Sequence, residues 1–338
     1  MTVENSVLLQ KVKELYARLQ KAALTAEDIE APSNVTFPDY SAVIKQLYEE
    51  PETFQTRFYC FIPIFDIFRA FRNPDTLVLD VGAHLGYSAI AMRRHGCSAK
   101  IVSIDAIPSN VLSLAQLKEL EGEAYDYIHC AVGDSVGELR LYVPVMNGVG
   151  ITAIASTGGT LSEHFAIHLA QQASSYPNVS KPGVDEPRIA ILDIKSSTLD
   201  SLFEDRGEVE RIVAIKMDLE GNEGPAVKGA EGIFRRSKPL LMVEGANRDP
   251  VVAEAMKSYG YFHCERYDGV LRVQQKTSMA QDGFWVHPDR VVNYRSLGIF
   301  EGELPESFQA REYASVVCVP RGIGLASVDI RVIPRADF

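Results

Sequence analysis

From residue 76 onward, short apolar runs alternate with segments of helical periodicity, and this alternation most limits what the chain can fold into. Strands that alternate with helices predict parallel βαβ units, and they exclude a helical bundle or a β-sandwich. The expected strands are 77–81, 100–105, 127–132, 212–218 and 240–244, and the expected helices are 86–95, 109–120 and 223–235. This order describes an α/β fold with a doubly wound, mostly parallel sheet. Segments 261–273 and 284–288 also have strand character and are expected to pair antiparallel at the sheet edge.

The rest of the chain is divided around this sheet. Residues 1–73 contain amphipathic helical patterns interrupted by Pro51 and Pro63, so a helical N-terminal cap is expected there. The sheet domain then covers 74–290, and 291–338 form a C-terminal extension. Within the domain, 144–189 are rich in Gly, Ser, Thr and Pro. Such a loop insertion serves either as a flexible connection or as a lid over an active site.

Composition excludes several classes of protein. The formal net charge is −11 and no long basic run offsets it, which disfavours nucleic acid as a partner. The most apolar early stretch, 60–71, is too short for a membrane span and contains Asp66 and Arg69. The N-terminus does not resemble a signal peptide, and the five cysteines are scattered without a CxxC pair. A cytoplasmic protein without disulfides is expected, and a homo-oligomer is left open.

The first expected strand ends in a glycine-rich turn that leads into a helix. Backbone N–H groups in such a turn can approach a ligand closely. The glycines are Gly82 and Gly86, so the middle glycine of a dinucleotide-binding G-x-G-x-x-G is missing. Asp80, two residues before Gly82, would repel a pyrophosphate but attract the positive charges of S-adenosylmethionine. The turn therefore favours S-adenosylmethionine over NAD as the cofactor.

The next two strand ends supply further candidate cofactor contacts. Asp105 ends the second strand, where an acid is placed to accept both hydrogen bonds from an adenosine ribose diol. The third strand continues into Cys130-Ala-Val-Gly-Asp134, in which Ala131, Val132 and Asp134 can meet an adenine. For Asp134, an ordinary role as a turn residue has equal weight.

The fourth and fifth strand ends supply the candidate catalytic groups. Transfer of a methyl group to a protonated nucleophile needs positioning and a group that removes the proton. Asp218 and Glu220 end the fourth strand and Glu244 ends the fifth, at the edge where the ligand crevice of such a sheet opens. A structural ion pair of Lys216 with Asp218 or Glu220 is the alternative. Three carboxylates could also hold Mg²⁺, a second alternative that is not favoured because such groups also bind sugar hydroxyls directly.

Several segments together resemble the FkbM family of S-adenosylmethionine-dependent methyltransferases. They are DVGAHLGYSAIAM, KIVSIDAIPSN, CAVGD, STLDSLF, IKMDLEGNEGPAVKGA and KPLLMVEG, which lie between residues 76 and 245. The resemblance implies a Rossmann-like class I methyltransferase fold and O-methylation of sugars, glycans, lipids or polyketide-type products. Departures from the family pattern are His84 in place of Asn, Asp105-Ala106 in place of Glu-Pro, and Asn222 and Gly224, which are expected to loosen the turn after the motif.

These observations predict an S-adenosylmethionine-dependent O-methyltransferase that acts on a hydroxyl of a small molecule or carbohydrate. The alternatives are a Mg²⁺-assisted O-methyltransferase that acts on a diol and an NAD-dependent oxidoreductase. The candidate catalytic residues are Asp218, Glu220 and Glu244. The candidate cofactor-binding residues are Asp80, Gly82, His84, Gly86, Tyr87, Asp105, Ala106, Ala131, Val132 and Asp134.

Overall fold

The computed structural model of the chain describes residues 3–21, 23–57, 62–157, 187–244, 249–273, 282–305, 308, 316–318 and 330–332. The chain forms two compact units, Met1–Glu301 and Gly302–Phe338. In the second unit, β14 (Val316–Cys318) pairs antiparallel with β15 (Ile330–Val332). No helix among the described residues has the length and apolar character needed to cross a membrane. The boundaries drawn from the sequence at residues 73 and 290 remain predictions.

The first unit is built on an eight-stranded sheet with the order β12-β11-β13-β10-β9-β2-β3-β4. The strands are β2 (Leu77–Val81), β3 (Lys100–Asp105), β4 (Tyr125–His129), β9 (Ile212–Met217), β10 (Leu240–Glu244), β11 (Phe262–Tyr267), β12 (Val270–Val273) and β13 (Asp282–Val286). The five strands from β10 to β4 are parallel, and β13 runs antiparallel to both of its neighbours. The strand order reverses at β2, so ligands are expected at the carboxyl ends of β2, β3 and β9.

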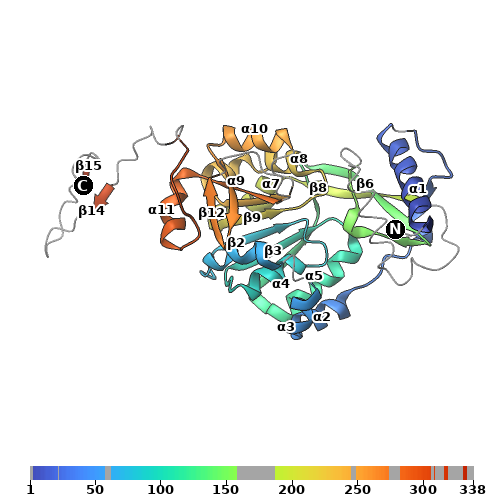
Figure 1. Cartoon of the computed structure of the whole chain (residues 1–338), viewed down its shortest axis with the longest axis horizontal. Helices are drawn as coiled ribbons and strands as arrows, with labels where there is room; N and C mark the ends of the chain where they lie inside the picture. Colours follow the sequence, from blue (N-terminus) through green and yellow to red (C-terminus); the bar gives the residue numbers. More distant parts are fainter. Residues whose placement is uncertain are drawn as a thin grey trace. The chain divides into compact units, whose positions relative to one another are not determined.

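Helices cover both faces of this sheet (Figure 1). They are α2 (Ser41–Glu49), α3 (Pro51–Arg57), α4 (Tyr87–Arg94) and α5 (Pro108–Glu121) on one face, and α7 (Leu199–Glu204), α8 (Glu223–Lys228), α9 (Glu231–Arg236) and α10 (Pro250–Ser258) on the other. The second group packs on the sheet through a buried cluster that includes Leu79, Ile215, Phe234 and Met256. Each fully buried apolar side chain of this kind stabilises the fold by about 1.5–3 kcal/mol. The core therefore fixes the strand ends that carry the site.

A second sheet, which the sequence pattern did not predict, lies beside the first. Its centre is the antiparallel pair of β6 (Gly137–Met146) and β8 (Arg188–Ser197), joined from Gly137↔Ser196 to Val145↔Arg188. Three short strands, β1 (Ile29–Glu30), β5 (Ala131–Val132) and β7 (Val149–Gly150), complete it. The segment 144–189, expected to be a loop insertion, thus begins inside β6 and ends inside β8. Residues 158–186, which include His164 and His168, lie outside the described residues.

Helix α1 (Val3–Gln20) packs against the second sheet. Val12, Leu15, Tyr16 and Leu19 are buried together with Met146, Ile151 and Ile189. The near-helical spacing of these apolar side chains in the sequence is thereby explained as packing. The remaining short elements are η1 (Pro32–Asn34), η2 (Ile62–Ala70), η3 (Gly122–Ala124), η4 (Thr152–Ile154), η5 (Val209–Arg211) and α11 (Pro288–Ser296).

Three elements differ from the pattern expected. Segment 127–132 divides between β4 and β5, so the chain passes from the first sheet to the second at Cys130. The helix expected over 223–235 breaks at Gly229, where a Cβ would lie 2.1 Å from the Gly133 carbonyl oxygen. Segment 261–273 forms the hairpin β11–β12, and β13 lies between β10 and β11 instead of at the edge.

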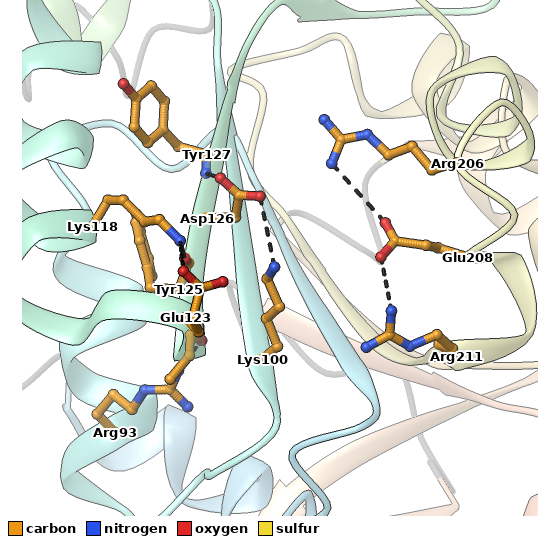
Figure 2. Close-up of polar contacts among 11 residues, drawn as sticks. Arg93, Lys100, Lys118, Glu123, Tyr125, Asp126, Tyr127, Arg206, Glu208 and Arg211 are labelled. Atoms are coloured by element: carbon orange, nitrogen blue, oxygen red, sulfur yellow. Dashed lines mark hydrogen bonds and ion pairs between the residues drawn. The ribbon is translucent and has the colours of Figure 1, made fainter.

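Partly exposed ion pairs lie near the sheet edges and contribute little to the stability of the fold. Figure 2 shows Lys100 with Asp126, Lys118 with Glu123, and Glu208 between Arg206 and Arg211. Exposed pairs of this kind contribute about 0–1 kcal/mol each, because water and salt screen them. Stability must therefore come mainly from the apolar core.

Candidate functional site

A cavity of about 870 Å³ opens at the carboxyl ends of β2, β3 and β9, where the strand order predicts a ligand. The loops after these strands supply one wall, and the second sheet with η4 supplies another. The polar residues of the first wall include His84, Asp105, Asn110, Lys216, Asp218 and Glu220, and the second wall includes Leu139, Leu141, Thr152, Ala153, Ala155 and Thr157. We call the second set the roof. Tyr40 and Val43, from the N-terminal part of the chain, also line the cavity.

The two glycines of the turn after β2 have different roles. Gly82 lines the cavity with φ +71°, and a Cβ there would lie 1.7 Å from the Asp218 carbonyl oxygen. Glycine is thus required for the β2 turn to lie against the β9 turn. Gly86 does not line the cavity, although it was a candidate cofactor contact. A Cβ there would lie 2.3 Å from Leu117 Cδ1, so Gly86 allows α4 to pack on α5.

Asp80 lies behind the cavity wall and does not reach the space in which a cofactor could bind. Its side chain is 0% exposed and does not line the cavity. Instead it accepts a hydrogen bond from Ser88 Oγ at 2.5 Å and forms an ion pair with Lys216 Nζ at 3.4 Å. The expectation that Asp80 attracts a cofactor directly is therefore wrong for this structure. A buried lysine ammonium lies beside it and neutralises its charge.

Asp105 lines the cavity at the end of β3, as predicted. Its Oδ1 accepts hydrogen bonds from Ile107 N (2.9 Å) and Asn110 Nδ2 (3.0 Å), and its Oδ2 accepts one from His84 N (2.8 Å). Burial raises the pKa of Asp105 to about 6, although these hydrogen bonds oppose the shift. A carboxylate has about four acceptor positions, so three internal bonds leave room for about one ligand hydroxyl instead of two.

His84 connects the loop after β2 to the roof. Its backbone has φ +50°, its N–H donates to Asp105, and its Nε2 lies 3.1 Å from Thr152 Oγ1. Burial lowers the pKa of His84 to about 4, so the ring is neutral near pH 7. A neutral ring can hydrogen-bond to the threonine hydroxyl without placing another charge beside Lys216.

Lys216 joins the β2 and β9 strand ends. Its Nζ donates to the Gly82 carbonyl oxygen at 3.0 Å and lies 3.4 Å from both Asp80 Oδ1 and Asp218 Oδ2. Burial alone would lower the pKa of Lys216, but Asp218 and Asp80 outweigh it and raise the pKa above its ordinary value. The ion pair that the sequence left as an alternative is therefore present. Asp218 nevertheless lines the cavity.

The turn after Asp218 is held tightly. Glu223 accepts hydrogen bonds from Leu219 N at 2.7 Å and Gly221 N at 3.0 Å, and Asn222 Nδ2 donates to the Val132 carbonyl oxygen at 2.7 Å. Between them Glu220 adopts φ +49°, which is unusual for a residue with a side chain. The loose turn that we expected from Asn222 and Gly224 is therefore not observed, because Asn222 ties it to the second sheet.

The remaining candidates fall into three groups. Tyr87, Ala106, Ala131 and Val132 line the cavity. Asp134 is exposed, accepts a hydrogen bond from Ser135 Oγ and lies outside the cavity lining, so it is a turn residue. The backbone of Glu244 pairs with β13, but its side chain lies outside the described residues.

Sequence reasoning missed much of the cavity lining, including the polar residues Asn110, Thr152 and Asn222. Asn110 is 2% exposed, and its Oδ1 has no hydrogen-bond partner among the described residues. Its place in the first turn of a helix after the β3 acid is the signal that could have identified it. Thr152 and Asn222 carried no such signal, because their partners belong to the second sheet.

The described side chains do not fit a magnesium site. None of them form a group of three His, Cys, Asp or Glu able to hold a metal ion. Asp218 already faces the Lys216 ammonium, a cation that would repel Mg²⁺ at the same oxygen.

The sheet order, with antiparallel β13 inserted beside parallel β10, and the acid at the end of β3 define a Rossmann-like class I methyltransferase. The family model described as "Methyltransferase FkbM domain" matches residues 80–276, more than half of the chain. The chain therefore belongs to the FkbM methyltransferase family. This finding overturns the alternative of an NAD-dependent oxidoreductase.

Two solved structures similar to the chain are both distant in sequence. The methyltransferase FkbM from Methylobacillus flagellatus KT has 14% identity and a TM-score of 0.37, over 81% of this chain and 58% of that chain. An O-methyltransferase from Bacillus cereus in complex with SAH has 12% identity and a TM-score of 0.28, over 82% of this chain and 90% of that one. The chain thus spans less than two thirds of the FkbM structure. No curated protein matches the sequence.

Proposed function

We propose that the protein transfers the methyl group of S-adenosylmethionine to a hydroxyl of a sugar, glycan or secondary metabolite. The observation that carries this proposal is that Asp218 and Glu220 line the same cavity as Asp105. A hydroxyl needs a proton acceptor as it attacks the methyl carbon, whereas the methyl donor itself needs none. Carboxylates beside the donor site therefore favour oxygen as the nucleophile.

The donor half of the cavity is formed by the loops after β2 and β3. Asp105 retains room for one ribose hydroxyl, and the unpartnered Oδ1 of Asn110 offers a second acceptor from the same wall. The residues present thus fit the adenosine part of S-adenosylmethionine. When bound there, this donor supplies an activated methyl group, and the protein supplies position and proton transfer.

The acceptor half is expected to lie between the β9 turn and the roof. Roof residues such as Leu141 and Ala153 are mostly apolar, and the opposite wall carries carboxylates. Among the described lining residues, Lys216 is the one with a cationic side chain, and Asp80 and Asp218 neutralise it. These features support an uncharged hydroxyl compound over a phosphate or carboxylate as the acceptor.

The test is transfer of labelled methyl from S-adenosylmethionine to a panel of methyl glycosides, oligosaccharides and hydroxylated polyketides. A methyl ether on a panel member, lost with Asp105→Ala and with the double variant Asp218→Asn/Glu220→Gln, is the expected result. S-adenosylhomocysteine should bind the double variant as it binds the natural protein. Methylation of nitrogen or sulfur in matched amine and thiol analogues, without any methyl ether, would contradict the proposal.

A further inference from the structure

Two carboxylates line the acceptor side of the cavity, but their surroundings differ. Asp218 Oδ2 lies 3.4 Å from Lys216 Nζ, and that ammonium is anchored in turn by Gly82 and Asp80. An ammonium beside a carboxylate stabilises the negative charge and makes that oxygen a weaker acceptor for a new proton. Asp218 is therefore suited to hold the β2 and β9 turns in place.

Glu220 has no such partner. The carboxylate lines the cavity and has no hydrogen bond or ion pair within the part of the chain that the structure describes. Its backbone is held at φ +49° because Glu223 binds the amides on both sides, at Leu219 and Gly221. A strained conformation that neighbouring bonds enforce is typical of residues positioned for function.

We infer that Glu220, and not Asp218, receives the proton of the acceptor hydroxyl; this inference rests on the proposed O-methylation. The acceptor oxygen forms a bond to the methyl carbon, and the bond from that carbon to sulfur breaks with its electron pair left on sulfur. The hydroxyl proton passes to the Glu220 carboxylate. The products are a methyl ether, neutral S-adenosylhomocysteine and protonated Glu220, so atoms and charge balance.

The charges around Glu220 agree with this role. Burial, together with Asp218 and with Glu223 of α8, raises the pKa of Glu220 to about 8, and Lys216 opposes the shift. From α1, Tyr16 also faces this charge, because burial and, to a smaller extent, Glu220 raise the pKa of that phenol. A carboxylate with a pKa near 8 is a stronger base than an ordinary one and is still largely available at slightly alkaline pH.

Infrared titration tests the ionisation of Glu220 without any acceptor. Difference spectra of the full chain between about pH 6 and about pH 10 should show loss of a protonated-carboxyl C=O band with a midpoint near 8. The band should be missing in Glu220→Gln and remain in Asp218→Asn. Glu265→Gln is the matched control, since Glu265 is buried but does not line the cavity. An unchanged band in Glu220→Gln overturns the inference.

Kinetics with a compound of the panel that the protein methylates test the role of Glu220 as proton acceptor. In the natural protein kcat/KM should rise as the pH increases through about 8, since the ionised form of Glu220 is active. We call this rise the limb of the pH profile. Glu220→Gln should lower kcat by about 10²- to 10⁴-fold and remove this limb, and Glu220→Asp should restore part of the rate. Asp218→Asn should keep the limb and shift it to lower pH, because the Asp218 charge helps to raise the pKa of Glu220. A limb lost in Asp218→Asn and kept in Glu220→Gln overturns the inference, whereas absence of any methyl ether with the natural protein refutes the O-methylation proposal instead.

Binding of S-adenosylhomocysteine to each variant shows that its fold and donor site are intact. Glu220→Gln with normal binding and a lost limb supports the assignment. If Glu220→Gln does not fold, the comparison of Glu220→Asp with the natural protein decides. A shifted limb in Glu220→Asp supports the inference, and an unshifted limb contradicts it.

Discussion

At the scale of single residues, close contacts decide more than chemical type. Gly82 was identified from the sequence as a possible ligand contact, but its closest constraint is the backbone of Asp218. Asp80 has the expected residue type and a different role, because Lys216 lies beside it. Sequence spacing shows which residues reach the strand ends, but it does not show which of them point to a neighbour and which to a ligand.

Gly82→Ala should therefore damage both stability and activity. The left-handed backbone costs a residue with a Cβ about 1–2 kcal/mol, and the clash with the Asp218 carbonyl adds to it. Gly122→Ala is the matched control, since Gly122 has φ +60° with nothing within 4 Å. Urea unfolding should show a larger loss of stability for Gly82→Ala than for Gly122→Ala. Equal losses would show that the turn after β2 can move away from the turn after β9 without a cost in stability.

Binding of S-adenosylhomocysteine should depend on pH through Asp105. The pKa of about 6 means that the carboxylate ionises as the pH rises through 6, and the ionised form is the better acceptor for a ribose hydroxyl. Affinity should rise roughly tenfold between about pH 5 and about pH 7 and then level off.

The stability of the protein should change in the opposite direction, because the folded state holds the Asp105 proton more tightly than the unfolded chain does. It should fall as the pH rises from about 4 to about 6.

Calorimetric titration with S-adenosylhomocysteine from about pH 5 to about pH 7 measures the change in affinity, and Asp105→Asn should remove the pH dependence of that affinity. If the affinity of the natural protein for S-adenosylhomocysteine is constant from about pH 5 to about pH 7, Asp105 does not contact the ligand.

At the scale of elements, the sequence predicted those whose signals are local. The strands expected at 77–81, 100–105 and 240–244 match β2, β3 and β10, because apolar runs flanked by turn residues define them within a few residues. The β6 and β8 pair was not predicted, since its two strands are separated by more than forty positions and only their pairing reveals them. The break between α8 and α9 was also missed; it falls at Gly229, whose backbone lies against the carbonyl of Gly133, a residue distant in the chain.

The turn between β9 and α8 is an element with its own test. Glu223→Ala removes two backbone hydrogen bonds and should release Glu220 from its left-handed conformation. We expect a loss of about 2 kcal/mol in stability and a lower kcat, with the affinity for S-adenosylhomocysteine nearly unchanged. Glu231→Ala is the control, because that glutamate forms an exposed pair with Arg235 and should change stability by less than about 0.5 kcal/mol. An unchanged kcat in Glu223→Ala would show that the turn holds its shape without Glu223.

At the scale of the first unit, the cavity is closed by joining two sheets. The first sheet contributes the loops after β2 and β3 and the carboxylates, and the second contributes the roof through β6 and η4. The bond between His84 and Thr152 crosses the space between them, and Asn222 with Val132 forms a second link. The site is thus assembled from segments that are distant in the chain, which explains why sequence reasoning found one wall of it.

Thr152→Val tests whether the roof is held by this link. The substitution keeps the shape of the side chain but leaves the part-buried His84 Nε2 without its described partner, at a cost of about 1 kcal/mol. Because the ring is neutral near pH 7, the loss should not depend on pH between about 6 and about 8. Amide hydrogen exchange over 137–157 should become faster in Thr152→Val. Thr152→Ser, which retains the hydroxyl, should exchange like the natural protein. Binding of S-adenosylhomocysteine should slow the amide exchange of the roof in both Thr152→Val and Thr152→Ser. Equal exchange in Thr152→Val and Thr152→Ser would mean that apolar packing by Leu139 and Leu141 holds the roof without the hydrogen bond.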